Sequence, residues 1–188
     1  MWKINPFNYS RRAAKTIQIG GLQLGGDQPV RVQTMANTDT NDIENSVAQC
    51  ERVVQAGADI LRFTTQGIRE AESVGKIHDQ IRAKGLNIPL VADIHFNANA
   101  ADVAATYVEK VRINPGNYVG SIKPGDTSDY TDEEFAAEFQ KIKERFVPFL
   151  EICKKNNTAI RLGVNHGSLS DRMMNRYGDT PQGMVASC

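Results

Sequence analysis

The sequence has few cysteines, no long apolar run and no excess of either charge. Its 188 residues contain three cysteines, Cys50, Cys153 and Cys188, and none of them belongs to a Cys-x-x-Cys pair. This spacing argues against a disulfide framework and gives no metal-ligand motif. Lys plus Arg equals Asp plus Glu at 22 each, so the chain has no net field to attract nucleic acid or an acidic membrane. Any anion site must therefore be local.

The chain also lacks the apolar segments that export or membrane insertion requires. No stretch approaches ~20 apolar residues, the length of a membrane span. The segment from Met1 to Arg12 places Trp2, Phe7 and Tyr9 among polar residues, without the continuous apolar region of a signal peptide. We therefore expect a cytoplasmic protein with no nucleic-acid partner and no membrane partner.

The first ordered element is predicted to be a hairpin. Residues 16–24 alternate between apolar and polar side chains around Gly20 and Gly21, which is typical of two short antiparallel strands. Hairpins of this kind often cap the base of a barrel. We assign residues 1–28 to an N-terminal extension with this hairpin, and residues 29–188 to a second region with a different pattern.

The second region repeats a short apolar strand followed by a helical stretch, the signature of parallel βα architecture. The expected strands are Val30–Thr34, Asp59–Phe63, Pro89–Asp93, Lys110–Ile113 and Ala159–Gly163. The expected helices begin near Asn41, Ile68, Ala98, Thr131, Ser168 and Pro181. A closed (β/α)8 barrel needs eight units in ~250 residues. Five units predict an α/β fold that is part of a TIM barrel, with the remaining units outside this sequence, in preference to an open sheet.

Local signals refine the helices. Asn41 with Glu44, and Thr131 with Glu134, have the spacing of a capping box. Pro148 lies inside the fourth expected helix, where a proline favours a kink. His78 lies in the second expected helix, where we expect it to face solvent.

Three arginines stand at the ends of expected strands. Arg62, Arg112 and Arg161 follow apolar residues in the second, fourth and fifth strands. In a barrel the carboxyl ends of the strands build the active site, and a guanidinium fork suits two phosphate oxygens. We therefore predict a phosphate site at this rim. The alternative is that each arginine pairs with a carboxylate such as Asp59 or Asp93.

Other polar residues are expected at the same rim. Asn114 and the segment from Asn165 to Ser168 follow the fourth and fifth strands directly, where they serve either as ligand contacts or as ordinary turn residues. Asp93 and His95 stand two positions apart and so on one side of an extended segment. They are candidates for acid–base catalysis, a metal contact or a structural pair. The polar run 33–40 is a candidate ligand loop.

These segments resemble the hydroxymethylbutenyl diphosphate synthases of the non-mevalonate isoprenoid pathway. The resemblance spans roughly residues 11–188 and is most specific in two runs, Val-Ala-Asp-Ile-His-Phe at 91–96 and Arg-Ile-Asn-Pro-Gly-Asn at 112–117. Thr34 stands where many relatives have Ser, a departure that keeps the hydroxyl. The residues around 110–130 and 165–172 look more like the long, plant-like form of the family.

The resemblance implies a function. In this family a cyclic diphosphate of methylerythritol is opened reductively to hydroxymethylbutenyl diphosphate, with electrons from ferredoxin or flavodoxin. It implies that Arg62, Arg112 and Arg161 hold phosphate oxygens, with His95, Asn114, Asn165 and Ser168 nearby. It also implies a 4Fe–4S cluster held by a C-terminal domain that this sequence does not contain, and a homodimer at full length. The chain alone is expected to bind no cluster and to be inactive.

Two alternatives remain open from the residues alone. One is a pteroate synthase-like phosphate-binding barrel, which shares polar groups after the first strand and basic residues at the rim. It would use a pterin and no cluster. The other is a non-catalytic binding module, in which the arginines pair internally.

Overall fold

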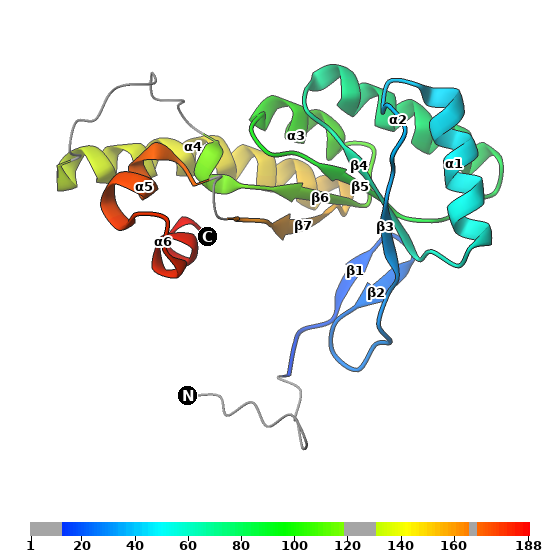
Figure 1. Ribbon diagram of the computed structural model, residues 1–188, viewed down its shortest axis with the longest axis horizontal. Helices are drawn as coiled ribbons and strands as arrows, with labels where there is room; N and C mark the ends of the chain where they lie inside the picture. The colour runs from blue at the N-terminus through cyan, green and yellow to red at the C-terminus, as the bar shows by residue number, and fades with distance from the viewer. Residues whose placement is uncertain (1–12, 119–130, 166–168) are drawn as a thin grey trace.

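The computed structural model describes residues 13–118, 131–165 and 169–188. It begins with an antiparallel hairpin of strands β1 (Ile17–Ile19) and β2 (Leu22–Leu24). Gly20 takes a φ of +56° in the turn, a left-handed conformation that glycine adopts without a steric penalty. Figure 1 shows this hairpin below the main sheet, on the side away from most of the helices. The predicted hairpin is confirmed.

The hairpin covers one end of the sheet. Ile19 is fully buried and packs in a small cluster with Ile60 and Val91, which lie early in two neighbouring strands. Leu22 and Leu24 pack against the same cluster. The hairpin therefore caps the base of the sheet, as expected. The boundary between residues 28 and 29 stays a prediction.

The sheet is parallel and follows chain order. Its strands are β3 (Gln33–Met35), β4 (Ile60–Thr64), β5 (Leu90–Asp93), β6 (Lys110–Ile113) and β7 (Ala159–Leu162). Each strand pairs with the next one along the chain, which is the connectivity of a TIM barrel. The five predicted βα units are confirmed.

Helices connect the strands. They are α1 (Ile43–Gln55), α2 (Ile68–Ala83), α3 (Ala98–Ala104), the short 3-10 helix η1 (Pro115–Asn117), α4 (Asp132–Asn156), α5 (Asp171–Tyr177) and α6 (Pro181–Ser187). Helices α1 to α4 line up along one face of the sheet, and α5 and α6 form a separate pair near the end of α4 (Figure 1).

The main core lies between the sheet and helices α1 to α4. Leu61 and Phe63 of β4 belong to one buried cluster with Val74 and Ile77 of α2 and Phe149 of α4. All five side chains are fully buried. Because side chains alternate along a strand, the intervening residues of β4 project from the other face. The alternation therefore places polar side chains on the face of the sheet that the helices do not cover.

Several predicted boundaries were wrong by a few residues. Strand β3 begins at Gln33 and not at Val30, which is 78% exposed. Helix α5 begins at Asp171, and Ser168 lies outside the described residues. Pro148 lies inside α4, as expected, and a kink at this proline stays a prediction. The Thr131 and Glu134 capping box is confirmed.

The first capping box was wrong. Helix α1 is capped by Asp42, whose carboxylate accepts from the Asn45 backbone N–H at 3.2 Å. Asn41 instead donates its side-chain amide to Glu70 at 2.8 Å and accepts from Ser73. The Asn41 side chain therefore links the start of α1 to α2, because its amide group forms hydrogen bonds with α2 and not with the first turn of α1.

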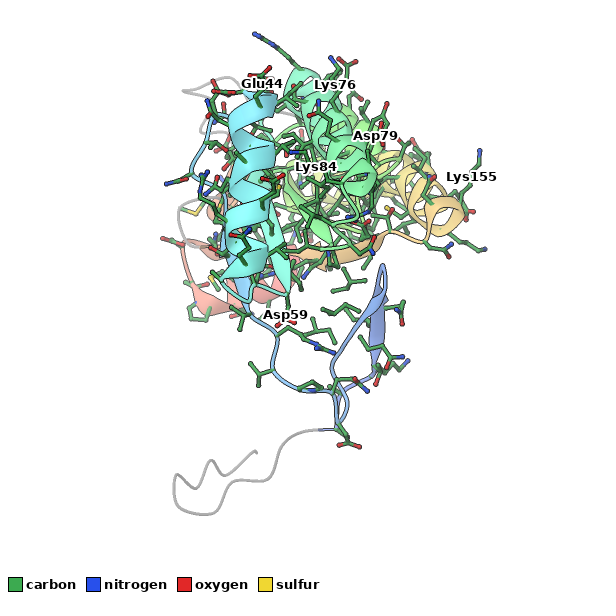
Figure 2. The ribbon with its side chains drawn as sticks, turned by 90° about the vertical axis from the view of Figure 1, so that its right-hand side faces the viewer. Glu44, Asp59, Lys76, Asp79, Lys84 and Lys155 are labelled. Carbon is green, nitrogen blue, oxygen red and sulfur yellow. The ribbon has the colours of Figure 1, made fainter. Side chains whose placement is uncertain are left out.

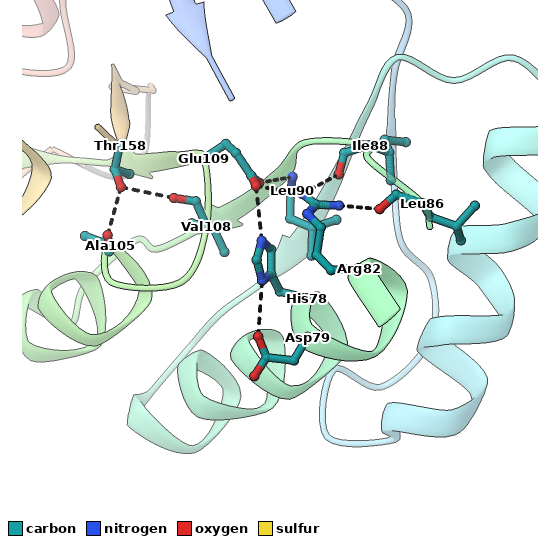
Figure 3. A network of polar contacts seen from close by, with 10 residues as sticks. All are labelled: His78, Asp79, Arg82, Leu86, Ile88, Leu90, Ala105, Val108, Glu109 and Thr158. Atoms are coloured by element: carbon teal, nitrogen blue, oxygen red, sulfur yellow. Dashed lines mark hydrogen bonds and ion pairs between the residues drawn. The ribbon is translucent and has the colours of Figure 1, made fainter. Parts of the chain in front are cut away.

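The expectation that His78 faces solvent was also wrong. Its Nε2 lies 3.1 Å from Glu109 Oε1, and the side chain is 20% exposed. Arg82 NH2 donates to the same oxygen at 2.6 Å, and the Leu90 N–H donates to the other at 2.9 Å. Figure 3 shows this network between α2 and the starts of β5 and β6. His78 and Arg82, which lie one turn apart on α2, therefore both contact Glu109 at the base of the sheet.

Candidate functional site

Two rows of side chains project from the face of the sheet that the helices do not cover. Residues in register on neighbouring parallel strands point to the same side. The upper row, at the carboxyl ends of the strands, is Thr64, Asp93, Arg112 and Arg161. The lower row, two residues closer to the base, is Met35, Arg62, Val91, Lys110 and Ala159.

The register corrects one sequence prediction. We expected Arg62 to share a rim with Arg112 and Arg161. Strand β4 runs on to Thr64, so Thr64 occupies the rim position and Arg62 lies one inward position deeper. Arg112 and Arg161 pair directly in register. The three arginines therefore line one concave surface at two depths.

Asp93 lies at the centre of this surface. Its carboxylate is 4% exposed and accepts from Arg62 NH2 through Oδ2. Oδ1 lies 3.4 Å from Arg112 NH1 and 3.2 Å from His95 Nε2. Arg112 also donates through NH2 to the Gly163 carbonyl at 2.8 Å. A single buried carboxylate thus orients two guanidiniums and one imidazole.

Positive charge exceeds negative charge on this surface. Among the described residues, the two rows contain four cations and one carboxylate, namely Arg62, Lys110, Arg112, Arg161 and Asp93. Burial lowers the pKa of Arg112; Asp93 opposes this effect, and Arg62 and Arg161 add to it. Such crowding of like charges at low solvent exposure favours a bound anion.

Internal pairing explains only part of the arrangement. Arg62 and Arg112 do pair with Asp93, as the alternative interpretation required. Asp59 does not take part, because it lies toward the hairpin end of the molecule (Figure 2) and contacts Arg31 at 3.8 Å. Arg161 is exposed and, within the ranges that the structure describes, has no carboxylate partner. Asp93 therefore neutralises only part of the positive charge on this surface.

A pocket opens beside Asp93 at the carboxyl end of the sheet. It has a volume of about 420 Å³ and is lined by Thr64, Thr65, Gln66, Asp93, His95 and Phe96. The His95 side chain is 38% exposed and Phe96 is 71% exposed. The pocket therefore combines hydroxyl and amide groups with an imidazole and an aromatic ring at its mouth.

The polar run after β3 is held by one buried side chain. Gln49 of α1 accepts from the backbone N–H groups of Asn37 and Thr38 at 3.2 and 3.3 Å, and donates to Asn37 Oδ1 at 2.7 Å. Thr38, Thr40 and neighbouring residues also line a second hollow that shares Thr64 and Gln66 with the first. Loop anchoring accounts for part of this polarity, and a role as a ligand loop stays a prediction.

The two asparagines occupy different environments. Asn114 is buried, and its side-chain oxygen accepts from the Gly116 N–H at 3.2 Å at the start of η1. This contact supports the turn interpretation. Asn165 is exposed just beyond β7. Both make further polar contacts, and whether either one touches a ligand stays a prediction.

Sequence reasoning missed Lys110. It is 6% exposed and belongs to the lower row, two residues before Arg112 on the same strand. The alternation of β6 was the signal, because residues two apart on a strand share a face. A lysine at the start of an apolar strand is, however, equally typical of a strand boundary.

The cysteines of the described chain do not form a site for an iron–sulfur cluster. Burial raises the pKa of the Cys50 thiol to about 11 and that of Cys153 to about 12, which keeps both protonated and poor metal ligands. Both pack in the main core, whereas Cys188 is exposed. No group of three His, Cys, Asp or Glu side chains with metal-binding geometry occurs among the described residues.

Comparison with known families gives a match over most of the chain. A family model described as the GcpE TIM-barrel domain matches residues 14–188. The chain belongs to this GcpE family. The match covers the whole strand and helix repeat of the sheet.

Curated relatives agree with the family match. A protein of Parabacteroides distasonis is 62% identical over 97% of this chain and 30% of its own length. One of Bacteroides fragilis is 60% identical over 97% of this chain and 29% of its own length. Both are named 4-hydroxy-3-methylbut-2-en-1-yl diphosphate synthase (flavodoxin). The GcpE chain thus spans about a third of the length of the relatives it matches.

A solved structure gives a weaker likeness. A dihydropteroate synthase of Xanthomonas albilineans shares 16% identity, with a TM-score of 0.47 over 91% of this chain and 69% of that chain. A likeness at this level says nothing of function. Within the described part of the GcpE chain, no helix is both long and apolar enough to cross a membrane.

Proposed function

We propose that this GcpE chain is the substrate-binding barrel portion of an enzyme that opens 2-C-methyl-D-erythritol 2,4-cyclodiphosphate to 4-hydroxy-3-methylbut-2-enyl diphosphate. The observation that carries the proposal is the concave surface with four cations around one carboxylate. The names of relatives up to 62% identical support the same reaction.

The arginines grip the diphosphate in this proposal. Arg161 and Arg112 bind phosphate oxygens at the rim, and Arg62 binds them from the lower row. Asp93 keeps the forks of Arg62 and Arg112 in place before the ligand arrives, so less conformational freedom is lost on binding. A guanidinium fork suits a phosphoryl group because it donates two parallel hydrogen bonds.

His95 is the proposed acid–base group at the pocket. Its Nε2 faces Asp93, which fixes the ring and leaves Nδ1 as the second nitrogen available for proton exchange. The reaction consumes two electrons and two protons and releases one water, so a proton donor near the departing oxygen is needed. Asn114, Asn165 and Ser168 are proposed to lie near the diphosphate.

The remaining parts of the enzyme are proposed to lie outside this chain. A 4Fe–4S cluster in a further domain would supply the electrons to the substrate, and flavodoxin, named with the relatives, or ferredoxin would deliver them. The remaining barrel strands and a homodimeric assembly complete the proposal, together with a cytoplasmic location. Relatives about three times as long as the chain fit the long form of the family.

The test is turnover of the cyclodiphosphate by the full-length protein, reconstituted anaerobically with iron and sulfide and supplied with a strong one-electron reductant. We expect product from the wild type and none from Arg112→Ala, with Arg52→Ala on α1 as the matched control. No turnover from a protein with an intact cluster spectrum would refute the synthase proposal.

A further inference from the structure

Lys110 is a buried cation for which the described residues provide no counter-ion. It is 6% exposed and lies in the lower row, between Val91 of β5 and Ala159 of β7. Within residues 13–118, 131–165 and 169–188, its ammonium has no hydrogen-bond acceptor and no carboxylate partner. Buried lysines are almost always paired, so an unpaired one needs an explanation.

Its surroundings make the burial more costly. Burial lowers the pKa of Lys110, and the charges of Arg161 and Arg62 lower it further. Nothing opposes these effects, in contrast to Arg112, for which Asp93 provides a counter-charge. Lys110 therefore lies in a region of net positive potential with no carboxylate directed at it.

A second donor in the same region is also unsatisfied. Arg62 uses NH2 for Asp93, but its buried Nε has no hydrogen-bond partner in the part of the chain that the structure describes. Arg62 and Lys110 belong to the same row of the sheet, with Val91 between them. A buried donor left unpaired costs stability. Two cationic side chains of one row with unused donors would suit a bound anion.

We propose that Lys110 and Arg62 Nε form a deep anion subsite beneath the rim, which takes the second phosphoryl group of a diphosphate whose first group is held by Arg112 and Arg161. The inference rests on the proposed function, since it assigns a residue to the same ligand. Successive inward positions on a strand are roughly 6.6 Å apart. This step separates the upper and lower rows, and the long, flexible side chains of arginine and lysine allow cations of both rows to reach the two linked phosphoryl groups of one diphosphate.

The subsite predicts opposite effects on binding and on stability. An unpaired buried charge destabilises the ligand-free protein, so an apolar replacement of Lys110 should leave the free energy of unfolding unchanged or raise it. The same replacement should weaken the diphosphate contact. If instead Lys110 pairs with a carboxylate elsewhere in the full-length protein, its replacement would leave that carboxylate unpaired and lower stability.

The experiment titrates the full-length protein with inorganic pyrophosphate and, separately, inorganic phosphate at fixed ionic strength by calorimetry. The quantity compared is the ratio of the two dissociation constants, which does not depend on the fraction of folded protein. The variants are Lys110→Met, the charge-keeping Lys110→Arg, and Lys76→Met as a control at an exposed lysine of α2 (Figure 2). Thermal unfolding without ligand is measured on each.

We expect Lys110→Met to reduce the preference for pyrophosphate about tenfold, the effect of one lost charge-assisted contact. Lys110→Arg should restore part of the preference, and Lys76→Met should change neither quantity. A preference in Lys110→Met equal to that in Lys76→Met would overturn the subsite and leave the proposed function intact. Absence of pyrophosphate binding by the wild type would overturn the subsite and the proposed diphosphate grip together.

Discussion

The guanidinium of Arg112 lies directly against Gly163, at the end of the neighbouring strand. Its NH2 donates to the Gly163 carbonyl at 2.8 Å, and a β-carbon on residue 163 would overlap Nε and the adjoining guanidinium atoms. The space that a side chain would fill at this position is therefore occupied by the arginine. Gly163 positions Arg112 across the two strands, with Asp93 on the other side.

Gly163→Ala tests this relationship. The methyl group should push the Arg112 guanidinium out of its position and weaken pyrophosphate binding about tenfold, while overpacking costs ~1–3 kcal/mol of stability. Calorimetric titration and chemical denaturation measure the two effects. Gly21→Ala is the control, since a β-carbon there meets nothing within 4 Å. Unchanged pyrophosphate affinity in Gly163→Ala would show that the position of Arg112 does not matter.

Arg161→Ala should separate binding from stability. Arg161 is exposed and, in the described chain, has no ion-pair partner, so its removal should change the free energy of unfolding by less than ~0.5 kcal/mol. Pyrophosphate affinity should fall, and its dependence on salt concentration should weaken because one cation is lost. Arg52→Ala, an exposed arginine in the last turn of α1, is the matched control. Equal salt dependence in both variants would contradict the proposed role of Arg161.

Asp93→Asn should destabilise the ligand-free protein and make it depend on anions. The variant keeps the shape of the side chain but leaves Arg62 and Arg112 without their shared carboxylate, a loss of ~3 kcal/mol for a broken buried pair. Pyrophosphate should restore part of this stability by replacing the counter-charge. Denaturation curves with and without pyrophosphate measure this.

Asp59→Asn provides the comparison for Asp93→Asn. Asp59 is 31% exposed and pairs with Arg31 at 3.8 Å, so the corresponding loss should be ~1 kcal/mol or less. Pyrophosphate should not restore it, because Asp59 lies at the other end of the sheet. Similar behaviour of the two variants would refute a special role for Asp93.

The network of His78 and Glu109 predicts a pH dependence of stability. The hydrogen bond to Glu109 raises the pKa of His78 above 6.5, although burial and Arg82 oppose the shift and Asp79 adds to it. Its stabilising effect is therefore complete below pH 6.5 and is lost as the pH rises through the raised pKa. Burial opposes ionisation of Glu109, but hydrogen bonds from His78, Leu90 and Arg82 lower its pKa to about 2.

The pKa shifts of His78 and Glu109 together define the pH range in which their ion pair stabilises the fold. The effect of Glu109 is complete above pH 4.5 and is lost as the pH falls toward 2. His78→Gln should therefore cost most stability between pH 4.5 and 6.5 and progressively less at higher pH, as measured by chemical denaturation at several pH values. A cost that is constant from pH 5 to 9 would show that the charge of His78 contributes nothing.

The sequence alone determined the order and type of the main elements. Apolar runs of β4 and β5 and the periodic apolar stripes of the helices recur in one order, and a parallel sheet is the arrangement that buries them all. Gly20 marked the hairpin because its turn needs a left-handed conformation. The end of β3 was harder to locate, because Val30 and Val32 are apolar but exposed at the sheet edge. The local sequence pattern does not show which apolar residues near an edge strand are left without neighbouring side chains packed against them.

The site was predicted in part. The alternation of each strand indicated that Arg112 and Arg161 share a face, and the register confirms that they are paired. What the sequence did not contain is the relative depth of strands, which depends on where each strand starts against its neighbour. That register set Arg62 one position lower than expected and brought Lys110 level with it.

Contacts between segments far apart in the chain were decided only by the tertiary structure. Asp93 meets Arg62 and Arg112 from strands on either side of it, and His78 meets Glu109 across 31 residues. Each pairing depends on packing of elements that no local signal describes. The sequence thus determined which residues are cationic and which face they share. The fold decided which of them a carboxylate neutralises and which, like Lys110, have no partner among the residues that the structure describes.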